Sequence, residues 1–237
     1  QTLWIGSPSG LTAVDVATSD VSAPLNGRSV RSLATRASGG LWVGTSTGLA
    51  EQTPSGDASR HDAYVVRDPL VEDSAAHIEY DGDYIWFSNW SKSPNGAVVR
   101  HDRRDGTWRR FTRETILGTT RAKAPTEVKR IVARDGRVWF ATDHGVLRYD
   151  HASDGWRHYT VKDGLHSNNV RTLAVSDNAV WVAAEFSTRV SRLDISTDEW
   201  SRIRLSRLIH PRNYIYEMAS DGDAVWLTLS SSGVRRL

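Results

Sequence analysis

The sequence predicts an all-β protein, a β-propeller of about six four-stranded antiparallel blades. The first observation is a motif of an apolar residue, tryptophan and one or two small or β-branched residues, which recurs at Trp4, Trp42, Trp86, Trp139, Trp181 and Trp226. Successive copies are about 40 to 50 residues apart, the period of solenoids and propellers. The second observation is that turn residues recur about every eight to twelve residues without a helical period, which is typical of short antiparallel strands.

Each repeat contains four short β-like runs, which we call a to d, and the tryptophan of the motif lies in run b. Turns such as Asp135-Gly136 separate the runs, because Asp and Gly tolerate positive φ. Run d carries a second tryptophan in three repeats, at Trp108, Trp156 and Trp200. Four-stranded sheets repeated about an axis are propeller blades, and a straight solenoid is the competing architecture. The a runs are expected at residues 30–35, 75–80, 128–133, 170–175 and 215–220.

The repeat extends from residue 2 to residue 237, so we expect a single domain over residues 1–237. The chain starts in run b of the first repeat and stops in run c of the sixth, which predicts incomplete terminal blades. Either the ring has six blades with irregular ends, which we favour, or the chain is a piece of a longer array. Extra length falls at residues 91–95 and 113–127, in predicted surface loops where function often lies.

The composition restricts the classes of function. The chain has 30 Lys and Arg against 28 Asp and Glu, and a net charge of +2 is too small to indicate a nucleic-acid partner. It has no cysteine, which excludes disulfides, zinc–thiolate sites and thiol nucleophiles, and no apolar run long enough to span a membrane. We expect no cofactor and no bound metal. Because six of the ten tryptophans share one place in the repeat, we expect them to pack in the core.

A polar ring is predicted where the a runs line the channel of a propeller. When the a runs are aligned, one position is apolar in every run, and we expect this residue to pack against a neighbouring sheet. The apolar residues are Leu33, Ile78, Ile131, Leu173 and Met218. Strand alternation then directs the preceding residues to the opposite face, toward the channel. The candidate ligand-binding ring consists of His77, Glu79, Arg130 and Glu217. The alternative is that these side chains pair with one another and with channel water.

Basic residues directly precede these positions in three repeats. Arg31, Lys129 and Arg171 are expected nearer one mouth of the channel, together with Asn168 and its neighbours in the loop before the a run. Such a funnel suits a carboxylate, a phosphate or an acidic protein surface. The alternative is that these residues are ordinary solvated side chains.

The fifth repeat carries a recognisable pattern. Residues 164–175 read GLHSNNVRTLAV and are followed by Val180-Trp181-Val182, and residues 41–49 match the second half of the same pattern. This pattern resembles the repeat of two-component regulator propellers. The resemblance implies an extracytoplasmic ligand-sensing or interaction domain attached to a membrane-bound signalling protein, without a defined set of catalytic residues. The blade pattern also resembles, more distantly, that of streptogramin-type lyases, for which only His77 with Glu79 or Glu217 lies in a comparable place.

We therefore expect a non-catalytic propeller that binds a protein or a small anionic ligand, as a sensor ectodomain or a scaffold subunit of a membrane-attached assembly, in the periplasm or secreted. Trp and Arg dominate interface hot spots, so two loops are predicted to contact the protein partner. Their residues are Trp90, Lys92, Arg103, Arg104, Trp108 and Arg109. One alternative is a lyase or other enzyme acting at the channel mouth, and another is a carbohydrate-binding propeller in which Trp90 stacks on a sugar.

Overall fold

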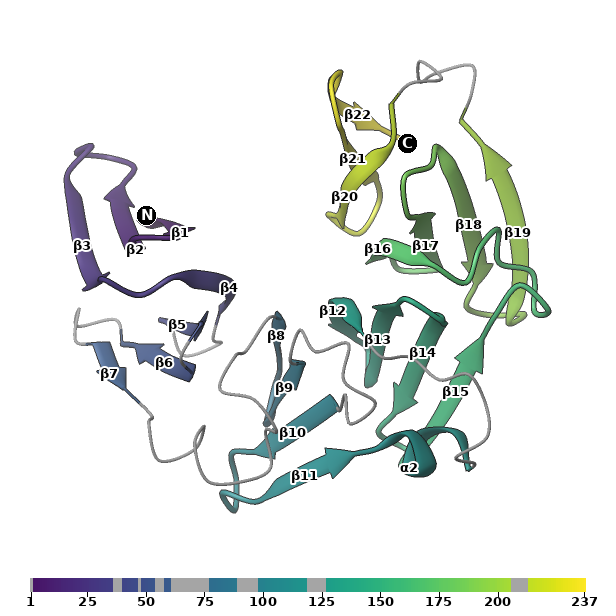
Figure 1. Ribbon diagram of the computed structural model, residues 1–237, viewed down its shortest axis with the longest axis horizontal. Helices are drawn as coiled ribbons and strands as arrows, with labels where there is room; N and C mark the ends of the chain where they lie inside the picture. The colour runs from purple at the N-terminus through teal and green to yellow at the C-terminus, as the bar shows by residue number, and fades with distance from the viewer. Residues whose placement is uncertain are drawn as a thin grey trace. The chain divides into compact units, whose positions relative to one another are not determined.

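The computed structural model describes residues 2–35, 40–46, 48–53, 58–60, 77–88, 98–118, 127–205 and 213–237. The chain divides into two compact units, Gln1–Thr112 and Arg113–Leu237. The described residues form six antiparallel sheets of three or four strands, three sheets in each unit, which confirms the all-β class and the six repeats (Figure 1). The expectation of a single domain stays a prediction. None of the helices in the described ranges has the length and apolarity to cross a membrane.

In the described part of the first unit, eleven strands form three sheets, and the first strand of each sheet contacts the first strand of the next. The first sheet is formed by β1 (Thr2–Ser7), β2 (Gly10–Asp15) and β3 (Val21–Asn26). The second is formed by β4 (Val30–Thr35), β5 (Leu41–Thr45), β6 (Gly48–Gln52) and β7 (Ala58–Arg60). The third is formed by β8 (His77–Asp81), β9 (Tyr84–Ser88), β10 (Val98–Asp102) and β11 (Trp108–Phe111).

The second unit contains the remaining three sheets, and β12 contacts β16, which in turn contacts β20. A one-turn helix, α2 (Arg113–Leu117), precedes the sheets and contacts β15. The first sheet is formed by β12 (Val128–Arg134), β13 (Arg137–Thr142), β14 (Gly145–Asp150) and β15 (Gly155–Tyr159). The second is formed by β16 (Val170–Val175), β17 (Ala179–Ala184), β18 (Arg189–Asp194) and β19 (Glu199–Arg204). The third is formed by β20 (Ile215–Ser220), β21 (Val225–Leu229) and β22 (Gly233–Arg236).

The strand bounds follow from local chemistry. Strands β4, β16 and β20 coincide with the predicted a runs. Between β12 and β13, Asp135 and Gly136 have φ values of 51° and 71°, and a tight antiparallel turn needs such residues. The first sheet starts with the strand of Trp4 and the last ends with a c strand, so the prediction of incomplete terminal sheets is confirmed for the described residues.

The predicted loop at 113–127 begins with helix α2. Ile116 and Leu117 are half-buried, and Gly118, at a φ of 65°, ends the helix with its N–H donating to the carbonyl oxygen of Glu114 at 2.8 Å. The other stretch of extra length, 91–95, lies outside the described residues.

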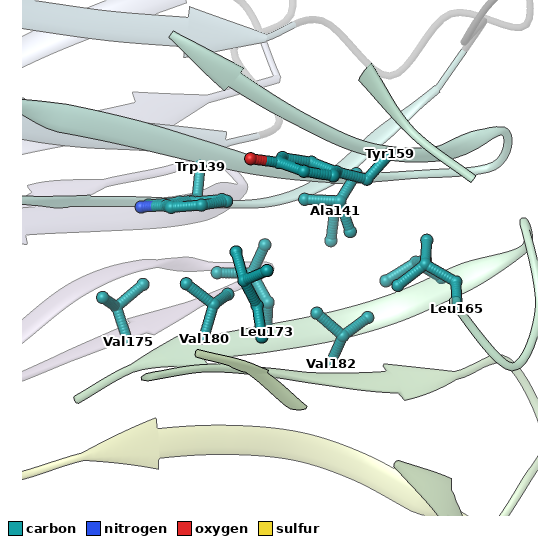
Figure 2. Packing of buried hydrophobic residues seen from close by; sticks show 11 residues of the cluster. Trp139, Ala141, Tyr159, Leu165, Leu173, Val175, Val180 and Val182 are labelled. Carbon is teal, nitrogen blue, oxygen red and sulfur yellow. The ribbon is translucent and has the colours of Figure 1, made fainter. Parts of the chain in front are cut away.

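The core of the second unit lies between its sheets. Figure 2 shows the rings of Trp139 and Tyr159 lying over Leu173, Val180 and Val182 of the following sheet, and all five residues belong to one buried cluster. The two rings stack with centroids 6.0 Å apart. Aromatic burial of this kind contributes several kcal/mol per side chain, on the order of 25 cal/mol per Å².

The tryptophans of the motif do not all pack in the core. Trp42, Trp86 and Trp139 are buried, as predicted, and Trp4 and Trp181 are half-buried. The prediction is wrong for Trp226, which is 41% exposed. The reason is that side chains along β21 alternate between buried and exposed, and only one face of this sheet packs against β16 and β17. Trp226 lies on the other face, where Arg236 stacks on its ring and Asp221 accepts its indole N–H at 3.0 Å.

Candidate functional site

The same irregularity occurs in four a strands. In β4, β12, β16 and β20 the register skips one residue against the neighbouring b strand, which is a β-bulge. A bulge bends its strand and redirects the side chain of the extra residue. The extra residues are Arg31, Lys129, Arg171 and Tyr216. Three of the four are the basic residues that the sequence places at a channel mouth, and the fold gives all of them one distinctive backbone position.

In the second unit, Glu185 brings two bulge residues together. Lys129 Nζ lies 2.6 Å from one carboxylate oxygen of Glu185, and Arg171 Nη1 lies 3.1 Å from the other. The side chain of Glu185 is only 8% exposed. Lys129 Nζ also donates to Asn169 Oδ1 at 2.8 Å. A buried carboxylate between two cations fixes their geometry, because charge-assisted hydrogen bonds are short and directional. The predicted basic funnel therefore contains a negative charge.

Arg171 links this cluster to an exposed aromatic side chain. Its Nε donates to the backbone oxygen of Tyr216 at 3.3 Å, and its guanidinium lies 4.5 Å from the centre of the Tyr216 ring. Tyr216 is 52% exposed. The planar guanidinium thus stacks on an aromatic face that remains open to solvent.

Two members of the predicted ring meet in the second unit. Arg130 Nε lies 3.9 Å from Glu217 Oε1, which also accepts hydrogen bonds from the Thr172 hydroxyl and, at 3.1 Å, from the N–H of Met218. Arg130 and Glu217 therefore pair with each other, which agrees with the alternative that the ring side chains pair among themselves. His77 and Glu79 lie two positions apart on β8 in the first unit, opposite Ser88 and Trp86 of β9. The ligand-binding role of all four stays a prediction.

The remaining candidates have structural contacts of their own. Asn168 accepts the N–H of Val161 at 2.8 Å through its side chain and the N–H of Gly145 at 2.6 Å through its backbone oxygen, so it organises the loop before β16. Arg31 is exposed on β4. Among the predicted contact residues, Trp90 and Lys92 lie outside the described residues, and the carbohydrate alternative, which depends on Trp90, stays a prediction with them.

The other predicted contact residues lie on and before β11. Arg104 donates to Asp102 through Nε at 3.0 Å and Nη2 at 2.6 Å, and these bonds lower the pKa of Asp102 from 3.8 to about 2. Arg103 donates to the hydroxyl of Tyr80 at 3.3 Å. Trp108 stacks on His101 with centroids 4.3 Å apart, and the exposed Arg109 lies over Phe111. Much of this arginine cluster is therefore engaged within its own sheet.

The sequence alone does not reveal Phe186, the most exposed aromatic side chain in the described ranges. Phe186, in the turn after β17, is 73% exposed and has a φ of 47°, which is rare for a bulky side chain. Its ring contacts Tyr214 edge to face, with centroids 5.4 Å apart, and Ser187 O accepts the N–H of Ile215 at 3.1 Å. The fifth repeat has Glu185-Phe186 where the second repeat has Ser46-Thr47. This departure from the repeat is the sequence feature that could have identified Phe186.

Across the ranges that the structure describes, no group of three His, Asp or Glu side chains is placed to hold a metal ion. What the second unit offers is a surface of cations and exposed aromatic rings around Glu185, Arg171, Phe186 and Tyr216. Aromatic and arginine side chains are enriched at the centres of protein interfaces.

No protein-family model matches the chain, and no curated protein matches it. Solved structures do resemble it. A chain in the crystal structure of a mitotic checkpoint complex is 14% identical, with a TM-score of 0.70, over 100% of this chain and 73% of that one. U3-55K is 12% identical, with a TM-score of 0.73, over 99% and 73%. The WD40 repeats of RRP9 are also 12% identical, with a TM-score of 0.73, over 99% and 72%.

WD40 repeats form β-propeller blades of four strands each. At these identities the likeness concerns the fold, and the resemblance to two-component regulator propellers stays a prediction. The described sheets and the similar solved structures agree on one architecture, so the chain has the fold of a β-propeller.

Proposed function

We propose that this chain is a non-catalytic propeller that binds another protein through an aromatic rim in its second unit. We define the aromatic rim as Phe186, Tyr214 and Tyr216 together with Arg171. The observation that carries the proposal is Phe186, a large apolar side chain that is 73% exposed and held outward by a left-handed backbone. A bulky residue in this conformation costs about 1 to 2 kcal/mol, which is more readily retained where the side chain has a role.

The neighbours of Phe186 have the composition of an interface. Tyr214 contacts its ring, and Tyr216 presents an exposed ring against Arg171. Tyrosine and arginine are enriched in binding hot spots because they combine apolar area with hydrogen-bonding groups. The fold also supports the proposal, since one similar chain lies in a mitotic checkpoint complex.

The cellular role that we propose rests on the resemblance of residues 164–183 to two-component regulator propellers. It supports a sensor ectodomain or a scaffold subunit outside the cytoplasm, attached to a membrane-bound assembly. As a sensor, the chain would bind a small anionic ligand at Lys129 and Arg171.

The test is chemical cross-linking of the purified chain in an extract of its source, followed by mass spectrometry. We expect Phe186→Ser with Tyr216→Ser to lose the partners that the unaltered chain captures. Val21→Ser with Val234→Ser is the matched control, because Val21 on β3 and Val234 on β22 are 68% and 54% exposed and are not members of the aromatic rim. If the rim variant captures the same partners as the control, the aromatic rim is not the binding surface.

A further inference from the structure

Three arginines gather at one corner of the sheet β16–β19. Arg189 on β18 lies directly opposite Arg204 on β19, and Arg202, two positions before Arg204, projects from the same face. All three are exposed. Like charges directly opposite each other on two strands are destabilising. We call Arg189, Arg202, Arg204, Lys162 and His166 the arginine corner.

The turn before β16 fixes one side of this corner. Arg202 Nε donates to the backbone oxygen of Gly164 at 2.9 Å, and the N–H of His166 donates to Ser191 Oγ at 2.9 Å. Ser191 is the cross-strand neighbour of Arg202. The turn approaches so closely that a Cβ on Gly164 would lie 2.7 Å from the Cβ of Trp200. The turn that carries the exposed Lys162 is therefore held against β19, where Arg202 also donates to the backbone oxygen of Val161 at 3.4 Å.

The corner has an excess of positive charge. Asp163 is the acidic residue of the turn, and its carboxylate accepts the N–H and hydroxyl of Thr160, at 2.7 Å and 3.0 Å. Within the described ranges, none of the three arginines forms an ion pair with a carboxylate. Burial lowers the pKa of His166, and the charges of Arg202, Arg189 and Arg204 lower it further. The imidazole thus senses a positive field.

Several other arginines of the second unit form ion pairs with carboxylates. Arg148 and Arg157 both contact Asp198, and Arg171 contacts Glu185. Asp194 and Glu199 lie opposite each other at the far end of β18 and β19. With a rise of about 3.3 Å per residue, five residues separate Glu199 from Arg204 by roughly 17 Å. The two strands therefore carry acidic groups at one end and, at the other, arginines that have no carboxylate partner among the described residues.

We propose that the arginine corner docks an acidic segment of the partner protein. The inference rests on the proposed protein-binding function and names the chemistry of the partner. Arginine forms bidentate hydrogen bonds with carboxylates, and the exposed guanidinium groups of Arg189 and Arg204 keep these donors available. Phe186, three positions before Arg189, is an exposed apolar side chain in the turn that leads into β18. The net charge of +2 provides no broad attraction for nucleic acid, so the observations favour a protein segment.

The experiment measures binding of a fluorescent octaglutamate peptide by anisotropy, with octaglutamine as the uncharged probe. We expect octaglutamate alone to bind. We expect Arg189→Glu with Arg204→Glu to weaken its binding by about tenfold or more, since two favourable charge contacts are lost and the reversed charges add repulsion. NMR titration gives an independent readout, because bound carboxylates offset the arginine field and raise the pKa of His166 in the unaltered chain.

The matched control is Arg235→Glu with Arg236→Glu on β22, which makes the same change in net charge at exposed positions. Circular dichroism checks that both variants fold. Equal weakening by the two variants, or no octaglutamate binding below millimolar concentration, would overturn the proposal. So would an octathymidylate that binds more tightly than octaglutamate and depends on the corner. Partners that still cross-link through the aromatic rim would leave the proposed function standing while this inference fails.

Discussion

At the scale of single residues, Glu185 matters most because two cations converge on it. Its side chain is 8% exposed, and it contacts both Lys129 and Arg171. We expect Glu185→Gln to destabilise the second unit by about 1 to 3 kcal/mol, since it leaves two partly buried cations without their counter-charge. Urea unfolding measures the change. Glu199→Gln, at an exposed position, is the control and should change the free energy of unfolding by less than about 0.5 kcal/mol.

Asp102 makes the free energy of unfolding depend on pH. Hydrogen bonds from Arg104 lower the pKa of Asp102 from 3.8 to about 2 in the folded chain. The ionised carboxylate therefore stabilises the folded state above pH 4, and this contribution disappears as the pH falls toward 2. We expect it to amount to about 1 to 2 kcal/mol, because the partner Arg104 is solvent-exposed and screened. The free energy of unfolding of Asp102→Asn should depend less on pH between 5 and 2 than that of the unaltered chain, and identical pH profiles would contradict this assignment.

At the scale of elements, the turns decide where strands begin. Gly145 starts β14 with a φ of 112°, and a Cβ there would lie 2.2 Å from the backbone oxygen of Tyr159. Gly136, in the turn before β13, has a φ of 71°, and a Cβ at this position would have no neighbouring atom within 4 Å. We expect Gly145→Ala to cost about 3 kcal/mol or more, because β14 and β15 must separate, and Gly136→Ala to cost about 1 kcal/mol from the backbone conformation alone. Thermal unfolding compares them, and equal losses would contradict the close approach at Gly145.

Element bounds were the most predictable part of the fold. Strand alternation and Asp-Gly turns are local signals, so β4, β16 and β20 lie where the sequence places them. The bulges were not predictable, because one extra residue leaves the apolar pattern of an a strand almost unchanged. The exposure of Trp226 was missed for another reason: the motif specifies a position in a strand, whereas burial depends on which faces of the sheet are covered.

The candidate site likewise contains residues that the sequence could predict and residues that it could not. Alignment of the a runs located Lys129, Arg130, Arg171 and Glu217 close to one another in the second unit. Glu185 was missed because it follows a different strand, β17, where it contacts Arg171 of the same sheet and Lys129 of the preceding sheet. The outward position of Phe186 depends on its φ of 47°, which its sequence neighbours do not encode in any simple way.

At the scale of the whole molecule, we expect residues 1–237 to unfold as one cooperative unit. The repeat continues through both compact units, and within each unit consecutive sheets bury their faces against each other. In repeat architectures this nearest-neighbour burial couples the stability of adjacent elements. Hydrogen exchange at increasing urea tests the expectation, with peptides from β9 reporting on the first unit and peptides from β17 on the second. Coincident transitions support a single domain, and a clear separation of the two midpoints would mean that Gln1–Thr112 and Arg113–Leu237 fold as independent domains.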